Sequence, residues 1–298
     1  MLEHLNTLKT TPARVVVMGA GGFVGGALGA RLARDGVPVL ALGRHQIDLL
    51  AEDAAERLAA MLRPDDAFVA VSALAPCKNS EMLVQNMVMA RAMVRALRAS
   101  PVAHVINISS DAVYADSAEP LTESSCTGPG TLHGAMHLAR EVMFRIEVSA
   151  PLAILRPSLL YGADDPHNGY GPNRFRRQAQ RGEDIVLFGE GEERRDHVFI
   201  DDLTEIVVQV LLHRSKGEIN VATGAVHSFR DVAEHVVRIS GKAVAIKGSP
   251  RSGPMPHNGY RRFEISACAD AFPDFRYTSL EQGLARAQRE METKGRRG

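Results

Sequence analysis

Two histidines, His133 and His137, lie four residues apart in a stretch whose apolar spacing predicts a helix over His133–Val148. That spacing places both rings on one face of the helix. A neutral imidazole can accept or donate a proton near neutral pH, so the pair could take part in acid/base chemistry. Ser110 and Asp111 directly follow a predicted strand, at the end where ligands bind in open parallel sheets. These four residues are the candidate catalytic groups.

A glycine-rich stretch, GAGGFVG, separates a predicted strand from a predicted helix. Its first glycine permits a sharp turn, the second lets backbone N–H groups approach a diphosphate, and the third lets the helix pack against the strand. The N-terminus of the helix would face the diphosphate with its dipole and free N–H groups. We therefore expect a dinucleotide site, with a purely structural turn as the alternative. The residues expected to contact the cofactor here are Gly19, Gly22, Phe23, Val24 and Gly25.

The end of the second predicted strand bears on which dinucleotide binds. An NAD site usually has an acidic residue there for the ribose 2′-hydroxyl, but this chain has Arg44 after Gly43. A guanidinium can pair with a 2′-phosphate, so NADP is favoured and NAD is possible. Arg44 could instead be a solvated surface residue. Asp48 and Leu49 are placed to lie beside the adenine. Residues at the ends of further strands are also expected in the cofactor site: Ala73, Leu74, Ala75 and Pro157.

The order of predicted elements defines the fold class. Predicted strands are 14–18, 37–42, 67–73, 102–109, 152–155, 185–188, 197–200 and 218–221, and predicted helices are 23–35, 51–62, 81–99, 133–148, 201–213, 229–240 and 279–290. The alternation indicates an α/β, doubly wound parallel sheet (a Rossmann fold) with a smaller C-terminal α+β substrate lobe. We expect a dinucleotide-binding domain from 1–157 plus 185–222, and a substrate lobe from 158–184 plus 223–298. Residues 162–173, rich in Gly, Pro and Asn, are expected to be a loop.

Composition excludes several classes of function. The 298 residues carry 35 basic and 35 acidic side chains, so the formal net charge is zero and a nucleic-acid partner is not expected. No apolar run has the length of a membrane span, and residues 1–13 lack the apolar core of a secretory signal. Three widely spaced cysteines, without a CxxC pair, favour a reducing, cytoplasmic location. No metal is expected, because a zinc ion on the two histidines would have no identifiable third ligand.

Several motifs occur together and in a family's order. They are GAGGFVG at 19–25, SSDAVY at 109–114, LTESSCTGPGTLHG at 121–134, RPSLLYG at 156–162, GEGEERRDHVFIDDL at 189–203 and RRFEIS at 261–266. With them the chain resembles the extended short-chain dehydrogenases/reductases, the NAD(P)-dependent nucleotide-sugar epimerase/dehydratase family, over about residues 14–285. The resemblance implies hydride transfer at a carbon of a nucleotide-activated sugar. It also implies a homodimer formed through helices 81–99 and 133–148.

The resemblance implies roles for individual residues, and the chain departs from the family's pattern at its two histidines. Ser110 matches the family's hydroxyl residue that hydrogen-bonds the reacting oxygen. Asp111 matches an acid found in 4,6-dehydratases, but Ala112 follows it where those enzymes have Glu. His133 and His137 stand where the family has Tyr and Lys. We expect His133 to replace the tyrosine as acid/base and His137 to bond the nicotinamide ribose.

Three alternatives stay open. Asp111, or a water held by Ser110, could supply the proton while His133 only shapes the pocket. The protein could bind its cofactor without hydride transfer, in a regulatory or scaffold role. The two histidines could bind zinc.

Arginines concentrate in the C-terminal half, and arginine binds diphosphates bidentately. By resemblance, Arg195 and Arg261 would hold the diphosphate of a nucleotide sugar, and Asn173 lies in the segment that covers it. Each arginine alone could equally be a solvated surface residue. The expected substrate-binding residues are Asn173, Arg174, Arg195 and Arg261.

Overall fold

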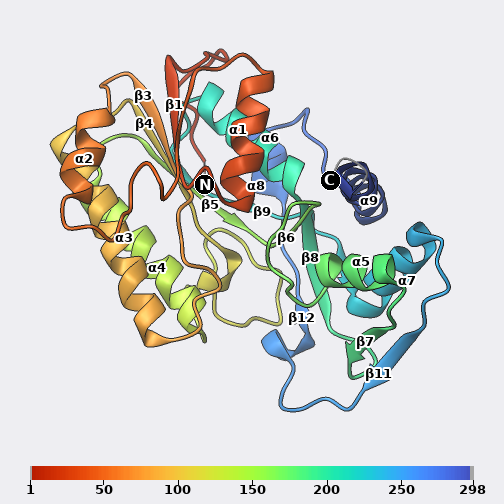
Figure 1. The fold of residues 1–298 in the computed structure, drawn as a ribbon. Coiled ribbons are helices and arrows are strands. Elements are labelled where there is room, and N and C mark those ends of the chain that lie inside the picture. Colours follow the sequence, from red (N-terminus) through yellow and green to blue (C-terminus); the bar gives the residue numbers. More distant parts are fainter. Residues whose placement is uncertain (1, 296–298) are drawn as a thin grey trace.

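The computed structural model describes residues 2–295. Its centre is a six-stranded parallel sheet with the order β2-β1-β3-β4-β5-β9 (Figure 1). The strands are β1 (Arg14–Met18), β2 (Val39–Leu42), β3 (Asp66–Ala70), β4 (His104–Ile108), β5 (Leu152–Pro157) and β9 (Gly217–Val221). The strand order reverses direction at β1 and β3, and ligands of open sheets bind outside the carboxyl ends of the strands at such a point.

Helices cover both faces of this sheet (Figure 1). One face carries α1 (Phe23–Arg34) and α6 (Ile200–Leu212), and the other carries α2 (Ala54–Met61), α3 (Ser80–Ala99) and α4 (Leu132–Glu147). Strands buried on both faces need apolar residues at nearly every position, and all five residues of β3 and of β4 are buried. The expected α/β, Rossmann-like fold class is confirmed. None of the helices within residues 2–295 is long and apolar enough to cross a lipid bilayer.

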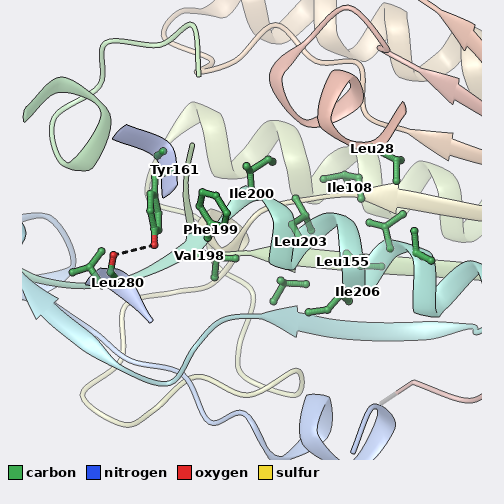
Figure 2. Packing of buried hydrophobic residues seen from close by; sticks show 14 of the residues in the cluster. Leu28, Ile108, Leu155, Tyr161, Val198, Phe199, Ile200, Leu203, Ile206 and Leu280 are labelled. Carbon is green, nitrogen blue, oxygen red and sulfur yellow. Dashed lines mark hydrogen bonds between the residues drawn. The ribbon is translucent and has the colours of Figure 1, made fainter. Parts of the chain in front are cut away.

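The α1/α6 face forms the larger apolar core. Figure 2 shows Leu203 and Ile206 of α6 packing near Ile108 and Leu155 of the sheet. The same cluster continues past Phe199 into the C-terminal part, so one continuous core joins the sheet to the elements beyond it. Burial of this apolar surface is the main stabilising contribution to the arrangement.

Residues after β5 build smaller sheets. β8 (Arg194–Phe199) pairs with β6 (Leu159–Tyr161), β10 (Val226–Ser228) and β12 (Tyr260–Arg261). A two-stranded sheet joins β7 (Ile185–Phe188) to β11 (Ile246–Ser249). The remaining elements are α5 (Pro172–Arg181), α7 (Phe229–Ser240), α8 (Ser266–Ala271), α9 (Leu280–Gly295) and the short 3-10 turns η1 (Asp111–Val113) and η2 (Pro256–Gly259). β9 thus rejoins the main sheet, whereas β7 and β8 lie outside it.

The structure corrects several predictions: β6, β10, β11, β12, α5 and α8 were not predicted, and the predicted strand 197–200 is β8, which begins at Arg194 and ends at Phe199. Residues 162–173 are not all loop, because α5 begins at Pro172 with glycine at its N-cap. This helix was not predicted, since proline and glycine at its start resemble a loop and its polar sequence has few apolar residues to mark a face. The predicted strand 67–73 ends at Ala70, and the N–H groups of Val71 and Ser72 both bond the carbonyl of Met18.

Candidate functional site

The turn between β1 and α1 has the geometry that the glycine pattern predicts. Gly19 has φ +107°, which is left-handed, and its backbone lies against Ser72 beyond the end of β3. A methyl group at Gly25 would overlap the carbonyl oxygen of Gly19, so the third glycine allows α1 to pack close to the turn. Gly22 caps α1 without any side-chain hydrogen bond. The first N–H groups of the helix are therefore available to an anion, and this cradle fits a dinucleotide diphosphate.

Side chains at the end of β2 are largely open to solvent. The Arg44 side chain is 77% exposed, and its Nε lies 3.4 Å from Oδ2 of Asp48. Asp48 also accepts a hydrogen bond from the N–H of Leu50 at 3.1 Å, and Leu49 is buried. Arg44 is thus free to reorient toward a 2′-phosphate at little cost, since an exposed ion pair is weak.

The segment after β3 is fixed by two buried side chains that the sequence analysis missed. Asn86 of α3 accepts from the N–H of Leu74 at 2.8 Å and donates to its carbonyl at 3.0 Å, so it clamps the middle of the 73–75 segment. Arg140 of α4 donates to the carbonyls of Ser72 and Ala70 at 2.7 and 2.6 Å. A polar residue at a buried position of an otherwise apolar helix face is the signal that could have identified both. Pro157 ends β5 and pairs with Val221 of β9.

The two histidines come together at the start of α4. Thr131 caps this helix by accepting from the N–H of Gly134 at 3.1 Å. The rings of His133 and His137 lie edge-to-face with their centroids 4.7 Å apart. Burial lowers the pKa of His133, although nearby Asp111 opposes that shift. Burial, helped by His133 and Arg140, lowers the pKa of His137 well below its ordinary value, so both rings are neutral near neutral pH.

His137 is buried, and its Nδ1 has no hydrogen-bond partner among residues 2–295. A buried polar atom left unpaired in this way is costly, and a bound hydroxyl group would relieve that cost. The predicted role toward a ribose hydroxyl fits this observation.

Ser110 and Asp111 lie at the carboxyl end of β4, as predicted. The Ser110 hydroxyl accepts from the N–H of Ala112 at 3.2 Å and donates to Oδ1 of Asp111 at 3.3 Å. The other carboxylate oxygen, Oδ2, lies 3.0 Å from Nε of Arg261 on β12. Asp111 is therefore both next to Ser110 and bound to a residue 150 positions later in the chain.

The predicted diphosphate-binding arginines are occupied by partners within the protein. Arg261 also donates to the Asp111 carbonyl at 2.6 Å, and it lies close to His257 and Asp116. Arg195 is bonded to Glu193 through Nε and Nη2, at 2.9 and 2.5 Å, while its buried Nη1 has no partner in the described residues. Burial lowers the pKa of Arg195. One free guanidinium donor beside Asp111 and Arg261 is thus available to an anionic group.

Asn173 and Arg174 are placed differently from these arginines. The Asn173 side chain is buried in the first turn of α5, where it donates to Asp165 at 2.5 Å and accepts from Arg176 at 3.0 Å. Both ends of its amide are therefore satisfied within its own segment. Arg174 lies beside it on α5 and is partly exposed.

A buried ion pair holds the histidine helix against the sheet. Glu141 of α4 binds Arg156 of β5 through two hydrogen bonds of 2.9 and 2.7 Å, and the side chains are 0% and 2% exposed. Glu141 also accepts from Ser109 at 2.6 Å, directly before Ser110. Although burial opposes it, contact with Glu141 raises the pKa of Arg156. The pair thus fixes α4 relative to the segment that carries Ser110 and Asp111.

Residues 2–295 contain no group of three or more His, Cys, Asp or Glu side chains arranged to hold a metal ion. The chemistry available at this site is therefore that of a diphosphate cradle, two neutral imidazoles, a serine–aspartate pair and buried guanidinium groups. This set can bind an anionic dinucleotide, hold a hydroxyl or carbonyl oxygen, and move a proton.

Comparison with known proteins agrees with this fold. A dTDP-6-deoxy-L-talose 4-dehydrogenase (NAD(P)(+)) from Kitasatospora kifunensis is 28% identical over 289 residues, covering 88% of this chain and 90% of that protein. The UDP-glucose 4-epimerase of Thermotoga maritima, solved with UDP-glucose, has a TM-score of 0.83 at 20% identity and covers 95% of this chain and 99% of that one. RMD from Pseudomonas aeruginosa, complexed with NADPH, has a TM-score of 0.82 at 21% identity, with the same coverage. These structures share the fold.

The model of one family matches residues 15–222, which include the glycine turn between β1 and α1, Ser110 and Asp111 after β4, and the helix α4 with its two histidines. The chain belongs to the NAD dependent epimerase/dehydratase family.

Proposed function

We propose that this protein is an NAD(P)-dependent oxidoreductase or epimerase that transfers a hydride at a sugar carbon of a nucleotide-activated sugar. The observation that carries the proposal is the uncapped, glycine-lined start of α1 beside the ends of the strands that present Ser110 and Asp111. A dinucleotide diphosphate held at that turn would extend along the ends of the strands. The family membership and the 4-dehydrogenase relative support this class of reaction.

The substrate class is supported by charge and by the relatives. Arg195 keeps one buried guanidinium donor without a partner among residues 2–295, and Arg261 lies between Asp111 and Asp116. A diphosphate would satisfy the free donor through charge-assisted hydrogen bonds. The Kitasatospora kifunensis relative is named for a dTDP-sugar, and the Thermotoga maritima epimerase was solved with UDP-glucose. Asn173 and Arg174, on the start of α5, would lie at the edge of the substrate site and not at its diphosphate.

A bound nicotinamide would supply or accept the hydride. This chain's residues would do the remaining work: His137 would hold a ribose hydroxyl, Ser110 would orient the reacting oxygen, and one of Ser110, Asp111 and His133 would exchange its proton. The sequence favours His133 for that exchange. In epimerisation the keto intermediate of the sugar would rotate within the site before the hydride returns to it. In ketoreduction a keto sugar would instead bind from solution.

Four further features complete the proposal. NADP is the favoured cofactor, since a solvent-exposed Arg44 follows β2 where NAD sites usually have an acidic residue, and NAD remains possible. A homodimer through α3 and α4 is supported by exposed apolar side chains on these helices, namely Val84, Leu132, Val142 and Ile146. We place the dinucleotide domain at 1–157 plus 185–222 and the substrate lobe at 158–184 plus 223–298. The free thiols of Cys77, Cys126 and Cys268 are in line with a cytoplasmic location.

A substrate panel tests this function. The purified protein is loaded with NADPH or NAD and mixed with UDP-, dTDP- and GDP-hexoses and with their 4-keto-6-deoxy forms, while nicotinamide absorbance and the sugar products are followed. The proposal predicts a redox change of the cofactor and a new sugar product with at least one compound. Tight cofactor binding without any turnover, unchanged in His133→Ala, would favour a regulatory or scaffold protein instead.

A further inference from the structure

The backbone N–H of Cys77 points at one specific nitrogen of His133. The distance from the Cys77 nitrogen to Nδ1 is 3.4 Å, and the N–H lies in hydrogen-bonding geometry. A backbone N–H can only donate, so Nδ1 must be the acceptor and must carry no proton. In a neutral ring the proton then sits on Nε2.

The donor in this contact is held in place. Cys77 is buried, and its thiol donates to the carbonyl of Asn79 at 3.7 Å. Asn79 in turn caps α3 by accepting from the N–H of Met82 at 2.9 Å. On its other side the His133 ring packs edge-to-face against His137. The ring therefore contacts both the segment that precedes α3 and His137 of its own helix.

This arrangement restricts what His133 can do. An imidazolium would need a proton on Nδ1, where it would face the Cys77 N–H, so the charged form is disfavoured. Burial acts in the same direction by lowering the pKa of His133. The Nε2 atom already carries its proton and cannot accept another. His133 can thus donate a hydrogen bond to a substrate oxygen but is poorly suited to exchange a proton with it.

Whereas His133 can only donate a hydrogen bond to a substrate, Ser110 can accept one. The Ser110 oxygen accepts from the Ala112 N–H, donates its own proton to Asp111, and keeps one lone pair for a further donor. The charged groups around Asp111 are Arg261 on β12, in direct contact, and Arg195 on β8, farther away. Its titratable neighbours are His133 of α4 and His257 of η2. A substrate hydroxyl could therefore donate to Ser110 while accepting from His133.

We propose that His133 acts as a neutral hydrogen-bond donor through Nε2, and that Asp111, acting through Ser110, is the group that exchanges the substrate proton. In oxidation the sugar C–H bond breaks and its electron pair leaves as hydride to the oxidised nicotinamide. The O–H bond breaks, its proton passes to Ser110 as the Ser110 proton passes to Asp111, and the C=O bond forms. Reduction reverses each transfer. The proposed proton transfer rests on the proposed function, because it needs a sugar substrate. The proposed protonation state of the His133 ring does not depend on that function.

Nitrogen NMR of protein labelled in its histidine rings tests the state of His133 without any substrate. The signals of His133 are assigned by their loss in His133→Gln. The proposal predicts a neutral ring with its proton on Nε2 at neutral pH, both free and with NADPH bound. A ring protonated on Nδ1, or a charged ring, would overturn it. The substrate panel can fail while this result holds, so the two proposals fail separately.

Two matched variants test the division of roles with whichever sugar nucleotide is turned over. His133→Gln keeps an acceptor for Cys77 and a donor for the substrate but cannot transfer a proton, so kcat should fall by less than about tenfold. Asp111→Asn keeps an acceptor for Ser110 but cannot take its proton, so kcat should fall by about 10²–10⁴-fold. NADPH affinity should stay unchanged in both, which controls for folding. The reverse order of kcat losses would contradict the proposal.

Discussion

At the glycine turn the groups offered to a ligand are backbone amides of α1, whereas across the site they are side chains of Arg195 and Arg261 that already have partners. The first set forms from a few consecutive residues and stays open without any partner. The second set is a network of ion pairs, in which the Arg195 guanidinium binds Glu193 and the Arg261 guanidinium binds Asp111 and Asp116. An anionic ligand would have to compete with these carboxylates. The comparison shows that the cofactor side is built locally, while the substrate side depends on contacts between distant parts of the chain.

The largest expected effect is at the buried ion pair of Glu141 and Arg156, which, like the arginine network, joins parts of the chain distant from the glycine turn. Glu141→Gln leaves the buried Arg156 guanidinium without its full counter-charge, which should lower the free energy of unfolding by about 3–5 kcal/mol. Chemical denaturation measures this loss. The exposed pair of Arg181 and Glu183 supplies the control, because Glu183→Gln should leave the denaturation midpoint unchanged. Equal losses in the two variants would remove the distinction between the buried network and surface charge.

The opposite end of β4 offers a pH test away from the site. Burial lowers the pKa of His104 to about 4, below its ordinary 6.5, while its Nε2 bonds the Ser215 carbonyl at 2.7 Å. The unfolded chain therefore takes up the proton first, so the stabilisation is complete above pH 6.5 and is lost as the pH falls to about 4. The loss should amount to about 3 kcal/mol.

Unfolding measured across this pH range in the wild type and in His104→Gln checks the assignment. Glutamine keeps a donor for Ser215 but does not titrate, so its stability should change less with pH. Parallel curves for the two proteins would show that His104 is not the source.

Replacing two glycines of α1 by alanine should change the stability of the protein in opposite directions. Gly25→Ala forces a methyl group into the Gly19 carbonyl, which should cost about 1–3 kcal/mol of stability and weaken NADPH binding. Gly29→Ala meets nothing within 4 Å and should stabilise α1 by about 0.5–1 kcal/mol. Thermal unfolding with and without NADPH measures both changes. Stabilisation by Gly25→Ala would mean that the turn is not packed as described.

The smallest expected effect concerns Arg44, the exposed side chain proposed to favour NADP over NAD. Arg44→Ala should weaken NADPH binding by about 1 kcal/mol, or roughly five- to tenfold in Kd, because the side chain is exposed and screened by solvent. NADH binding should not change. Fluorescence titration with both cofactors gives the comparison, and an equal loss for NADH would remove Arg44 from cofactor discrimination.

The same contrast explains what the sequence could predict. The bounds of β1, β7 and α7 were predicted to the residue, because β-branched runs and a Ser228 capping box are local signals. The glycine turn was predicted for the same reason. The pairing of Arg261 with Asp111 was not, since these residues lie 150 positions apart in the chain. The Cys77 contact to His133 likewise joins residues 56 positions apart.

Titration of the protein with NADPH, in competition with ADP-ribose and with adenosine, tests the central claim most directly. If the amides at the start of α1 hold the diphosphate, NADPH binds saturably, ADP-ribose displaces it, and adenosine, which lacks the diphosphate, competes far more weakly. Absence of saturable binding, or displacement by adenosine as effective as that by ADP-ribose, would contradict the account.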